Sequence, residues 1–142
     1  MAAVTTGIVV EPGAGFNGLV GLLVEESDER HARGSLAVRR EVMQPWGLVH
    51  GGVFATIAES LASWATAMVV GPEGQAALGL ANHTSFLRPV SEGTIHGLAT
   101  RRHRGRTTWV WDVDMSDDEG RLCATSRVTI AVRPLPPGSP GA

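Results

Sequence analysis

The chain has 142 residues, and its 12 basic and 14 acidic side chains give a formal net charge of −2. This length fits one domain with a substantial core, and the balanced charge excludes a global positive field that would attract nucleic acid or an anionic membrane. The single cysteine, Cys123, excludes an internal disulfide and fits a reducing compartment, so we expect a cytoplasmic protein.

The first part of the chain predicts a loose segment followed by two strands. Residues 1–17 contain glycines and a proline and are expected to be flexible. Strands are predicted over 19–25 and 32–39, with a polar turn at 26–30 between them.

An apolar run with helical spacing follows at 53–70. Val53, Ile57 and Leu61 recur every four residues and predict a buried helix face, which ends at Gly71-Pro72. The run approaches the length of a membrane span, but its polar residues favour a core helix instead. These polar residues are Thr56, Glu59, Ser60, Ser63 and Thr66.

Four strands without intervening helices are predicted after the helix. Alternation is clearest over 107–115, where Trp109, Trp111, Val113 and Met115 share one face. The four strands are expected over 75–87, 93–102, 107–115 and 122–132. In the last of them, the inward residues are expected to be Leu122, Ala124, Val128, Ile130 and Val132.

This order of elements favours an α+β fold in which an antiparallel sheet covers one helix. Residues 135–142 are rich in proline and glycine and predict a disordered tail.

Glu59 is the only formally charged residue between Glu41 and Glu73. A carboxylate on an apolar helix is costly to bury unless it is paired or functional. Upstream, Gly51 and Gly52 leave backbone amides bare at the helix start, which is how an oxyanion hole is built. These groups predict an acyl-transfer site; an exposed or interface glutamate is the alternative.

Other polar clusters carry weaker signals. Four arginines around Gly105, within 101–106, fit either a phosphate-binding patch or a solvated hairpin tip. No pair among the five histidines has metal-ligand spacing, so no metal site is expected. His50 is expected to cap the helix or orient the glycine turn, and His83 to be a hydrogen-bonded structural residue in a strand. Cys123 is expected to pack in the core.

Several segments together resemble the hotdog-fold acyl-CoA thioesterases, in which a curved antiparallel sheet wraps around one long central helix. The resemblance runs in order over residues 18–134 and is greatest to the 4-hydroxybenzoyl-CoA thioesterases that use glutamate rather than aspartate. The segments that carry it are WGLVHGG at 46–52 with Glu59, NHTSFLRPV at 82–90, RTTWVWDV at 106–113, GRLCA at 120–124 and IAVRP at 130–134.

The resemblance implies hydrolysis of an acyl-CoA to a carboxylic acid and free CoA, with no metal or other cofactor. Glu59 would be the nucleophile or general base, and the Gly51 N–H would polarise the thioester carbonyl. Ser63 would help to place the hydrolytic water, Gln44 would contact the reacting group, and His50 would belong to the same site. The residues that would bind CoA are Arg88, Arg106 and Thr107.

The chain departs from the family at four places, of which the first is Ser63, where the close relatives have threonine. Serine is usual where Arg106 stands, and the basic end of the family is replaced by Pro134-Leu-Pro-Pro137, so one phosphate contact is expected to be lost. Trp64, directly after Ser63, is expected to reshape the acyl pocket.

The spacing of Gly51 and Glu59 predicts a site shared by two subunits. The two residues are eight positions apart, which is about 12 Å along an α-helix. One thioester carbonyl cannot contact both groups of one helix. We therefore expect a homodimer in which Gly51 of one subunit faces Glu59 of the other. Separately from this spacing, we expect two such dimers to form a homotetramer.

The resemblance alone implies an aromatic acyl group similar to 4-hydroxybenzoyl, and with it a role in the degradation of aromatic compounds. The same chemistry on 1,4-dihydroxy-2-naphthoyl-CoA or phenylacetyl-CoA is an alternative. A hotdog hydratase or dehydratase is less favoured, because those relatives place a histidine and an acid differently. A non-catalytic acyl-CoA sensor is the alternative from another class.

Overall fold

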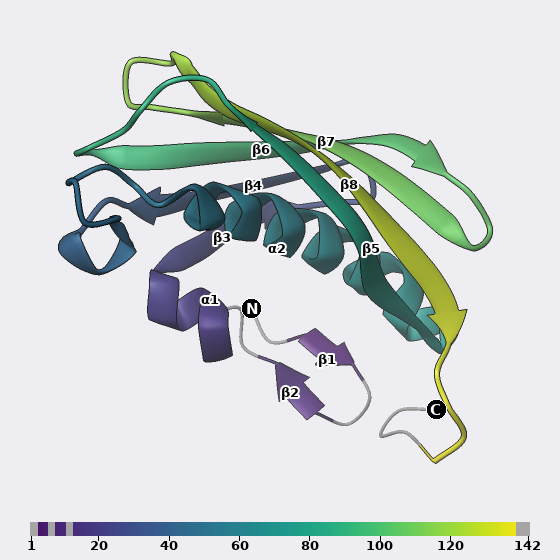
Figure 1. The fold of residues 1–142 in the computed structure, drawn as a ribbon. Coiled ribbons are helices and arrows are strands. Elements are labelled where there is room, and N and C mark those ends of the chain that lie inside the picture. Colours follow the sequence, from purple (N-terminus) through teal and green to yellow (C-terminus); the bar gives the residue numbers. More distant parts are fainter. Residues whose placement is uncertain (1–2, 6–7, 11–12, 139–142) are drawn as a thin grey trace.

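A six-stranded antiparallel sheet curved over one long helix dominates the molecule. The computed structural model describes residues 3–5, 8–10 and 13–138. The strand order is β3-β4-β6-β7-β8-β5, and all neighbouring strands are antiparallel. Helix α2 (Gly51–Val70) lies on the concave side of this sheet (Figure 1). The predicted α+β hotdog architecture is confirmed.

The strands expected after the helix are confirmed, with bounds that differ by no more than two residues. The strands of the main sheet are β3 (Leu22–Ser27), β4 (His31–Ala37), β5 (Gln75–Phe86), β6 (Thr94–Arg104), β7 (Thr108–Ser116) and β8 (Leu122–Pro134).

Small elements lie on the side of α2 away from the main sheet (Figure 1). A separate hairpin is formed by β1 (Ala3–Thr5) and β2 (Ile8–Val10), and helix α1 (Gly15–Val20) follows it. The prediction of a strand from residue 19 is wrong at its start, because α1 occupies this stretch and Gly21, at φ 81°, ends the helix. The remaining elements are the short 3-10 helices η1 (Arg40–Val42) and η2 (Gly71–Glu73).

The predicted flexible segment 1–17 and the predicted tail 135–142 fall partly on residues outside the described ranges. Positions 1–2, 6–7, 11–12 and 139–142 lie outside them. The flexibility of both segments therefore stays a prediction.

The core lies between α2 and the sheet. The inward face expected for β7 is confirmed, because Trp109, Trp111, Val113 and Met115 are at most 1% exposed. The alternation expected for β8 holds at its other positions, but Leu122 is 41% exposed. A register shift between Met115 and Ser116 inserts Cys123 into the core and turns Leu122 outward.

Two glycines let α2 approach the sheet closely. Gly34 of β4 and Gly97 of β6 are direct cross-strand partners. A Cβ atom at Gly97 would lie 2.9 Å from side-chain atoms of both Ile57 and Leu61. The helix therefore packs into a depression that only glycine leaves open.

Polar contacts fix the helix to the sheet at two further places. The Trp111 indole N–H donates to Thr66 Oγ1 (2.9 Å) inside the core. Near the other end of the helix, the Asn82 side-chain amide of β5 donates to the Ala55 carbonyl (2.9 Å), and the Thr84 hydroxyl donates to Asn82 Oδ1 (2.8 Å).

Helix α2 with the following turn is long and apolar enough to cross a membrane by length and composition alone. In this fold the apolar face of the helix packs against the sheet and is buried there.

Candidate active site

His50 is the N-cap residue of α2. Its backbone is extended, and its Nδ1 accepts a hydrogen bond from the Gly52 N–H (2.8 Å), so the neutral ring carries its proton on Nε2. The expected capping role of His50 is thereby confirmed. Within residues 13–138, the N–H of Gly51 has no hydrogen-bond partner. One amide at the positive end of the helix dipole is therefore available for a ligand oxygen.

The first cavity of the candidate site, here called the Gly51 cavity, has a volume of about 410 Å³. The Gln44 Oε1 atom accepts a hydrogen bond from the backbone N–H of Trp46, which leaves the Gln44 amide nitrogen free to donate. In the described part of the chain, the Arg88 guanidinium has no carboxylate partner. The main lining residues are Gln44, Leu48, Gly51, Phe54, Phe86 and Arg88.

The second cavity, here called the Glu59 cavity, opens further along the same helix and has a volume of about 330 Å³. The Glu59 side chain is exposed, and no hydrogen bond or ion pair to it occurs in the described ranges. Its carboxylate lies against Gly79 of β5, where a Cβ atom would stand 3.0 Å from Glu59 Oε1. The lining residues are Asn17, Glu59, Ser60, Ser63, Trp64, Ala67 and Ala77.

The predicted site residues thus divide between two regions of one chain. Gln44, His50 and Gly51 lie at the start of α2, and Arg88 follows the nearby end of β5 at Phe86. The other group is nearer the opposite end of β5. It contains Glu59 and Ser63, which line the Glu59 cavity. It also contains Arg106 and Thr107 in the β6–β7 loop. The next residue, Thr108, pairs across the sheet with Ala131 of β8, which in turn pairs with Leu78 of β5.

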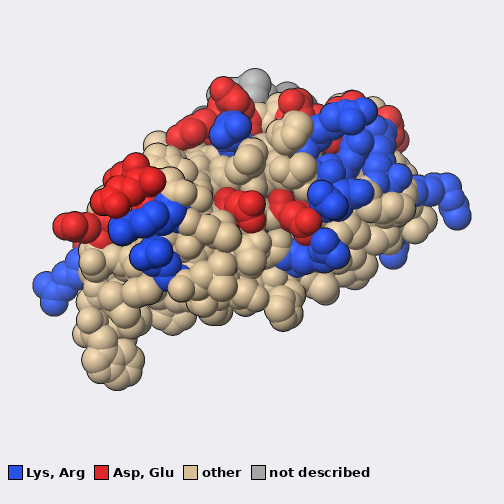
Figure 2. Space-filling view, turned by 90° about the horizontal axis from the view of Figure 1, so that it is seen from above, with Lys and Arg blue, Asp and Glu red and all other residues tan. Residues whose placement is uncertain are grey.

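The predicted phosphate-binding patch at 101–106 has fewer free arginine side chains than the sequence indicates. The guanidinium groups of Arg101 and Arg104 lie over the Trp109 ring, 5.1 and 4.9 Å from its centroid. Arg104 also pairs with Glu29 (3.3 Å), and Arg102 pairs with Asp112 (3.4 Å). Among the described residues, only Arg106 of the four lacks an ion pair or a stacking partner, although Figure 2 shows basic side chains gathered at this end of the sheet.

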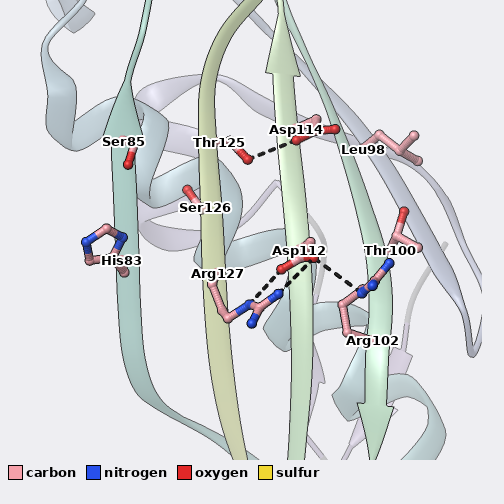
Figure 3. Close-up of a pocket in the computed structure, with 10 residues that line it drawn as sticks. All are labelled: His83, Ser85, Leu98, Thr100, Arg102, Asp112, Asp114, Thr125, Ser126 and Arg127. Carbon is pink, nitrogen blue, oxygen red and sulfur yellow. Dashed lines mark hydrogen bonds and ion pairs between the residues drawn. The ribbon is translucent and has the colours of Figure 1, made fainter.

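A further cavity, of about 430 Å³, lies on the outer face of the sheet, opposite α2. Figure 3 shows that Asp112 is its centre: its carboxylate binds Arg127 through two contacts (2.9 and 3.2 Å) and Arg102 through one (3.4 Å). His83 lines this face, within a strand as expected. The prediction of a hydrogen-bonded His83 is wrong for the described part of the chain, where its ring has no partner. This cavity is separate from the candidate site.

Another cavity, of about 680 Å³, lies between α1 and the first half of α2, and no sequence pattern predicted it. Phe16 and Leu19 of α1 form one wall, and this helix was not predicted. Sequence reasoning also missed Gly79, because its contact with Glu59 depends on how β5 lies against α2. In the described residues, no group of three or more His, Cys, Asp or Glu side chains could hold a metal ion.

One long helix inside a curved antiparallel sheet is the fold of a class of enzyme, the hotdog-fold thioester hydrolases. Residues 47–124 match the Thioesterase superfamily, and the chain belongs to this family.

Individual relatives agree with this assignment. The chain is 35% identical over 120 residues to the proofreading thioesterase EntH of Cronobacter turicensis, covering 80% of this chain and 87% of the relative. A solved mutant of the thioesterase PA1618 from Pseudomonas aeruginosa is 35% identical, with a TM-score of 0.80 over 84% of this chain and 86% of that one. The thioesterase HI1161 of Haemophilus influenzae is 33% identical, with a TM-score of 0.79 over 84% and 82%.

Proposed function

We propose that this thioesterase hydrolyses an aromatic acyl-CoA, similar to 4-hydroxybenzoyl-CoA, in a site built from two subunits with Glu59 as nucleophile or general base. The observation that carries the proposal is the division of the site residues between the Gly51 cavity and the Glu59 cavity. Each cavity holds half of the groups that the reaction needs. Since about 12 Å of helix separates Gly51 from Glu59, the second half must come from another copy.

Strand β5 supports the choice of interface. Among the described residues it is an edge strand paired only with β8, and it exposes Leu78 (54%) and Leu80 (59%). An exposed apolar edge is a template for pairing with another chain. If two β5 strands pair antiparallel, the Phe86 end of one strand lies beside the Gln75 end of the other. The Gly51 cavity of one subunit then faces the Glu59 cavity of its partner.

In the proposed reaction, the thioester oxygen accepts a hydrogen bond from the Gly51 N–H, which stabilises the developing negative charge. Glu59 of the partner subunit then acts in one of two ways. Its carboxylate attacks the carbonyl carbon, the C–S bond breaks, CoA leaves as thiolate, and water hydrolyses the mixed anhydride. Alternatively, the carboxylate accepts a proton from a water molecule that attacks the carbonyl carbon directly, after which the C–S bond breaks and CoA leaves as thiolate. Ser63 positions the water, and the Gln44 amide donates to the reacting group.

The CoA phosphates are proposed to bind Arg88, Arg106 and Thr107. Arg88 and Arg106 support this assignment because they are exposed and have no ion pairs in the described ranges. The loop that carries Thr107 is held in place, since Arg133 donates a hydrogen bond to the Thr107 carbonyl (2.8 Å).

We further propose that CoA is the only cofactor-like group involved, as part of the substrate, and that no metal takes part. We also propose a cytoplasmic homotetramer, a dimer of such dimers, that acts in the degradation of aromatic compounds and has no nucleic-acid or membrane partner. The single Cys123 supports the reducing compartment.

The shared site is tested by mixing two inactive variants. Gly51→Pro removes the N–H at the first helical position, where proline is tolerated and where the extended His50 backbone already suits it. Glu59→Gln removes the carboxylate. If the subunits exchange, about a quarter of the wild-type sites return in a 1:1 mixture, because half of the dimers are mixed and each has one intact site. A site contained within one chain would give no recovery.

The acyl group is tested by thiol release from 4-hydroxybenzoyl-CoA, 1,4-dihydroxy-2-naphthoyl-CoA and phenylacetyl-CoA. We expect kcat/KM for the first substrate of roughly 10⁴ M⁻¹s⁻¹ or more. A higher value for either other substrate reassigns the acyl group. Binding of all three without turnover, unchanged in Glu59→Gln, would establish a non-catalytic sensor.

A further inference from the structure

Helix α1 borders two cavities on the side of α2 away from the main sheet (Figure 1). Its residue Asn17 lines the Glu59 cavity. Phe16 and Leu19 line the cavity of about 680 Å³, here called the α1 cavity, whose other wall includes Val53 and Thr56 of α2. A shift of α1 into the α1 cavity would therefore withdraw Asn17 from the Glu59 cavity.

Few contacts hold α1 in its position. Only one of its six residues is buried, whereas Phe16 and Leu19 are 61% and 71% exposed. Among the described residues, the Ser60 hydroxyl donates to Asn17 Oδ1 (2.8 Å), and the only other side-chain hydrogen bond to α1 comes from Arg39. A segment with so few buried apolar contacts belongs to the part of a protein that opens most readily.

Glycines flank α1 and allow it to turn as a unit. Gly15 at its start has φ 64°, and Gly21 directly after it has φ 81°. Glycine adopts these values without the steric cost that other residues meet, and it accepts large changes of φ and ψ. Strand β3 begins at Leu22 and pairs with β4 from that residue on. A rotation about Gly21 therefore moves α1 while the sheet stays in place.

The two positions of α1 exchange contacts of comparable value. In the described position, the Ser60–Asn17 hydrogen bond is formed, and Phe16 and Leu19 line an open cavity. After a shift into the α1 cavity, this hydrogen bond is lost, but both apolar side chains pack against Val53. A partly exposed hydrogen bond contributes little net stability, and the burial of apolar surface offsets its loss. Two packings of similar free energy make α1 a two-state element.

We propose that α1 is a cover for the Glu59 cavity, and that it opens by moving into the α1 cavity. This inference rests on the proposed function, because the cavity that α1 covers holds Glu59 and Ser63. With α1 in its described position, Asn17 narrows this cavity and keeps bulk water from the reacting carbonyl. With α1 withdrawn, the acyl group enters and the free acid leaves.

The test fixes α1 in its described position with a reversible link. In the variant Asn17→Cys/Ser60→Cys, two thiols replace the hydrogen-bonded side chains, and a short bis-methanethiosulfonate bridges them until a reductant is added. The same variant treated with methyl methanethiosulfonate carries similar bulk without the link and is the matched control. The native thiol of Cys123 is buried and is expected not to react.

Phe16 reports the position of α1 without any substrate. The protein is labelled with 4-fluorophenylalanine, and the Phe16 ¹⁹F resonance is assigned by its loss in Phe16→Leu. We expect a soluble gadolinium chelate to broaden this resonance about twofold less in the control than in the linked protein, because the free α1 buries the ring for part of the time. Phe54, which is 4% exposed, is the internal reference. Equal broadening in both forms would overturn the movement of α1.

Thioester hydrolysis then tests whether this movement controls access to the site. The linked form should hydrolyse 4-hydroxybenzoyl-CoA roughly tenfold more slowly than the control, and reduction of the link should restore the rate. Equal rates in both forms would overturn the cover even if α1 moves. Hydrolysis by neither form nor by the wild type would instead overturn the proposed function, and the Phe16 resonance would still decide whether α1 moves.

Discussion

Gly79 is the residue whose backbone sets where the Glu59 carboxylate lies. A Cβ atom there would be 3.0 Å from Glu59 Oε1, and the register of β5 shifts between Gly79 and Ala81. A bulge commonly bends a strand next to an active site. We infer that the missing side chain and the bulge together leave room for the carboxylate at the sheet edge.

Replacing Gly79 with alanine should therefore impair turnover more than substrate binding. The methyl group displaces the Glu59 carboxylate, and we expect kcat to fall by about 10- to 100-fold with KM little changed. Steady-state kinetics checks this, with Ser85→Ala on the outer face of the same strand as the control. An unchanged kcat in Gly79→Ala would show that the contact does not position Glu59.

Asp118 links two turns at the other end of the sheet. Its carboxylate contacts His96 Nε2 (2.8 Å) and accepts a hydrogen bond from the Thr94 N–H (3.0 Å). These hydrogen bonds, that of His96 first, lower the pKa of Asp118 in the folded protein. A carboxyl group with a lowered folded pKa adds stability above its unfolded pKa and loses this contribution as the pH falls through the folded value.

The variant Asp118→Asn should accordingly be less stable than the wild type at neutral pH and closer to it in acid. The difference should shrink below about pH 4, where the unfolded carboxyl group takes up its proton. Urea unfolding at pH 3 and pH 6 measures the effect. The neighbouring Glu92→Gln is the control, because its side chain has no hydrogen bond in the described residues. A difference that does not vary with pH would contradict the assignment.

At the scale of the elements, α2 and the sheet fit together through the glycine pair Gly34 and Gly97. Since a Cβ atom at Gly97 would meet Ile57 and Leu61 at 2.9 Å, the helix has to move or the side chains have to change rotamer. The Gly97→Ala variant should lose about 1–3 kcal/mol of unfolding free energy. Urea denaturation measures the loss, and Gly13→Ala, which enters open space, should cost little. Equal stability of the two variants would show that the depression is not tightly filled.

The sequence predicts those elements in which a periodic pattern of apolar residues extends over many positions. Helix α2 and strand β7 were found because alternation or four-residue spacing persists through Ile57 and Leu61 or through Trp109 and Trp111. Helix α1 was missed because its six residues are too few for a periodic pattern, and its N-cap, Ala14, makes no side-chain hydrogen bond. The predicted inward direction of the Leu122 side chain is wrong because a register shift reverses the alternation of the two strand faces. No residue type near Leu122 indicates this shift.

The site was predicted only in part for a related reason. Gly51 and Glu59 could be placed because both lie on one helix, where spacing fixes their separation. The contact of Gly79 with Glu59 could not be predicted from the sequence, because β5 is joined to the sheet through β8, which comes about fifty residues later in the chain. The cavity beside α1 depends on packing that no local pattern contains.

At the scale of the whole molecule, the proposed pairing of two β5 edges would control assembly and, through the proposed shared site, activity. Lysine on an edge strand opposes pairing with another chain. The Leu80→Lys variant should therefore stay folded, form a smaller assembly than the wild type and lack thioesterase activity, because each site lacks its second half. Native mass spectrometry, far-UV circular dichroism and thiol release check the three points together. A fully active monomer would contradict the shared site.

The position of β8 in the sheet affects how the protein folds during its synthesis. Of the six strands of the main sheet, β8 is the last in the sequence, yet it lies between β7 and β5 and is the only strand in the described ranges that pairs with β5. While a ribosome synthesises the chain, α2 and β5 emerge before Val128 and Ile130 exist to cover them. The nascent protein therefore carries an uncovered apolar helix and a strand with two open edges until its final third has been translated. This interval is when a chaperone would matter most, and it ends when one strand closes the sheet.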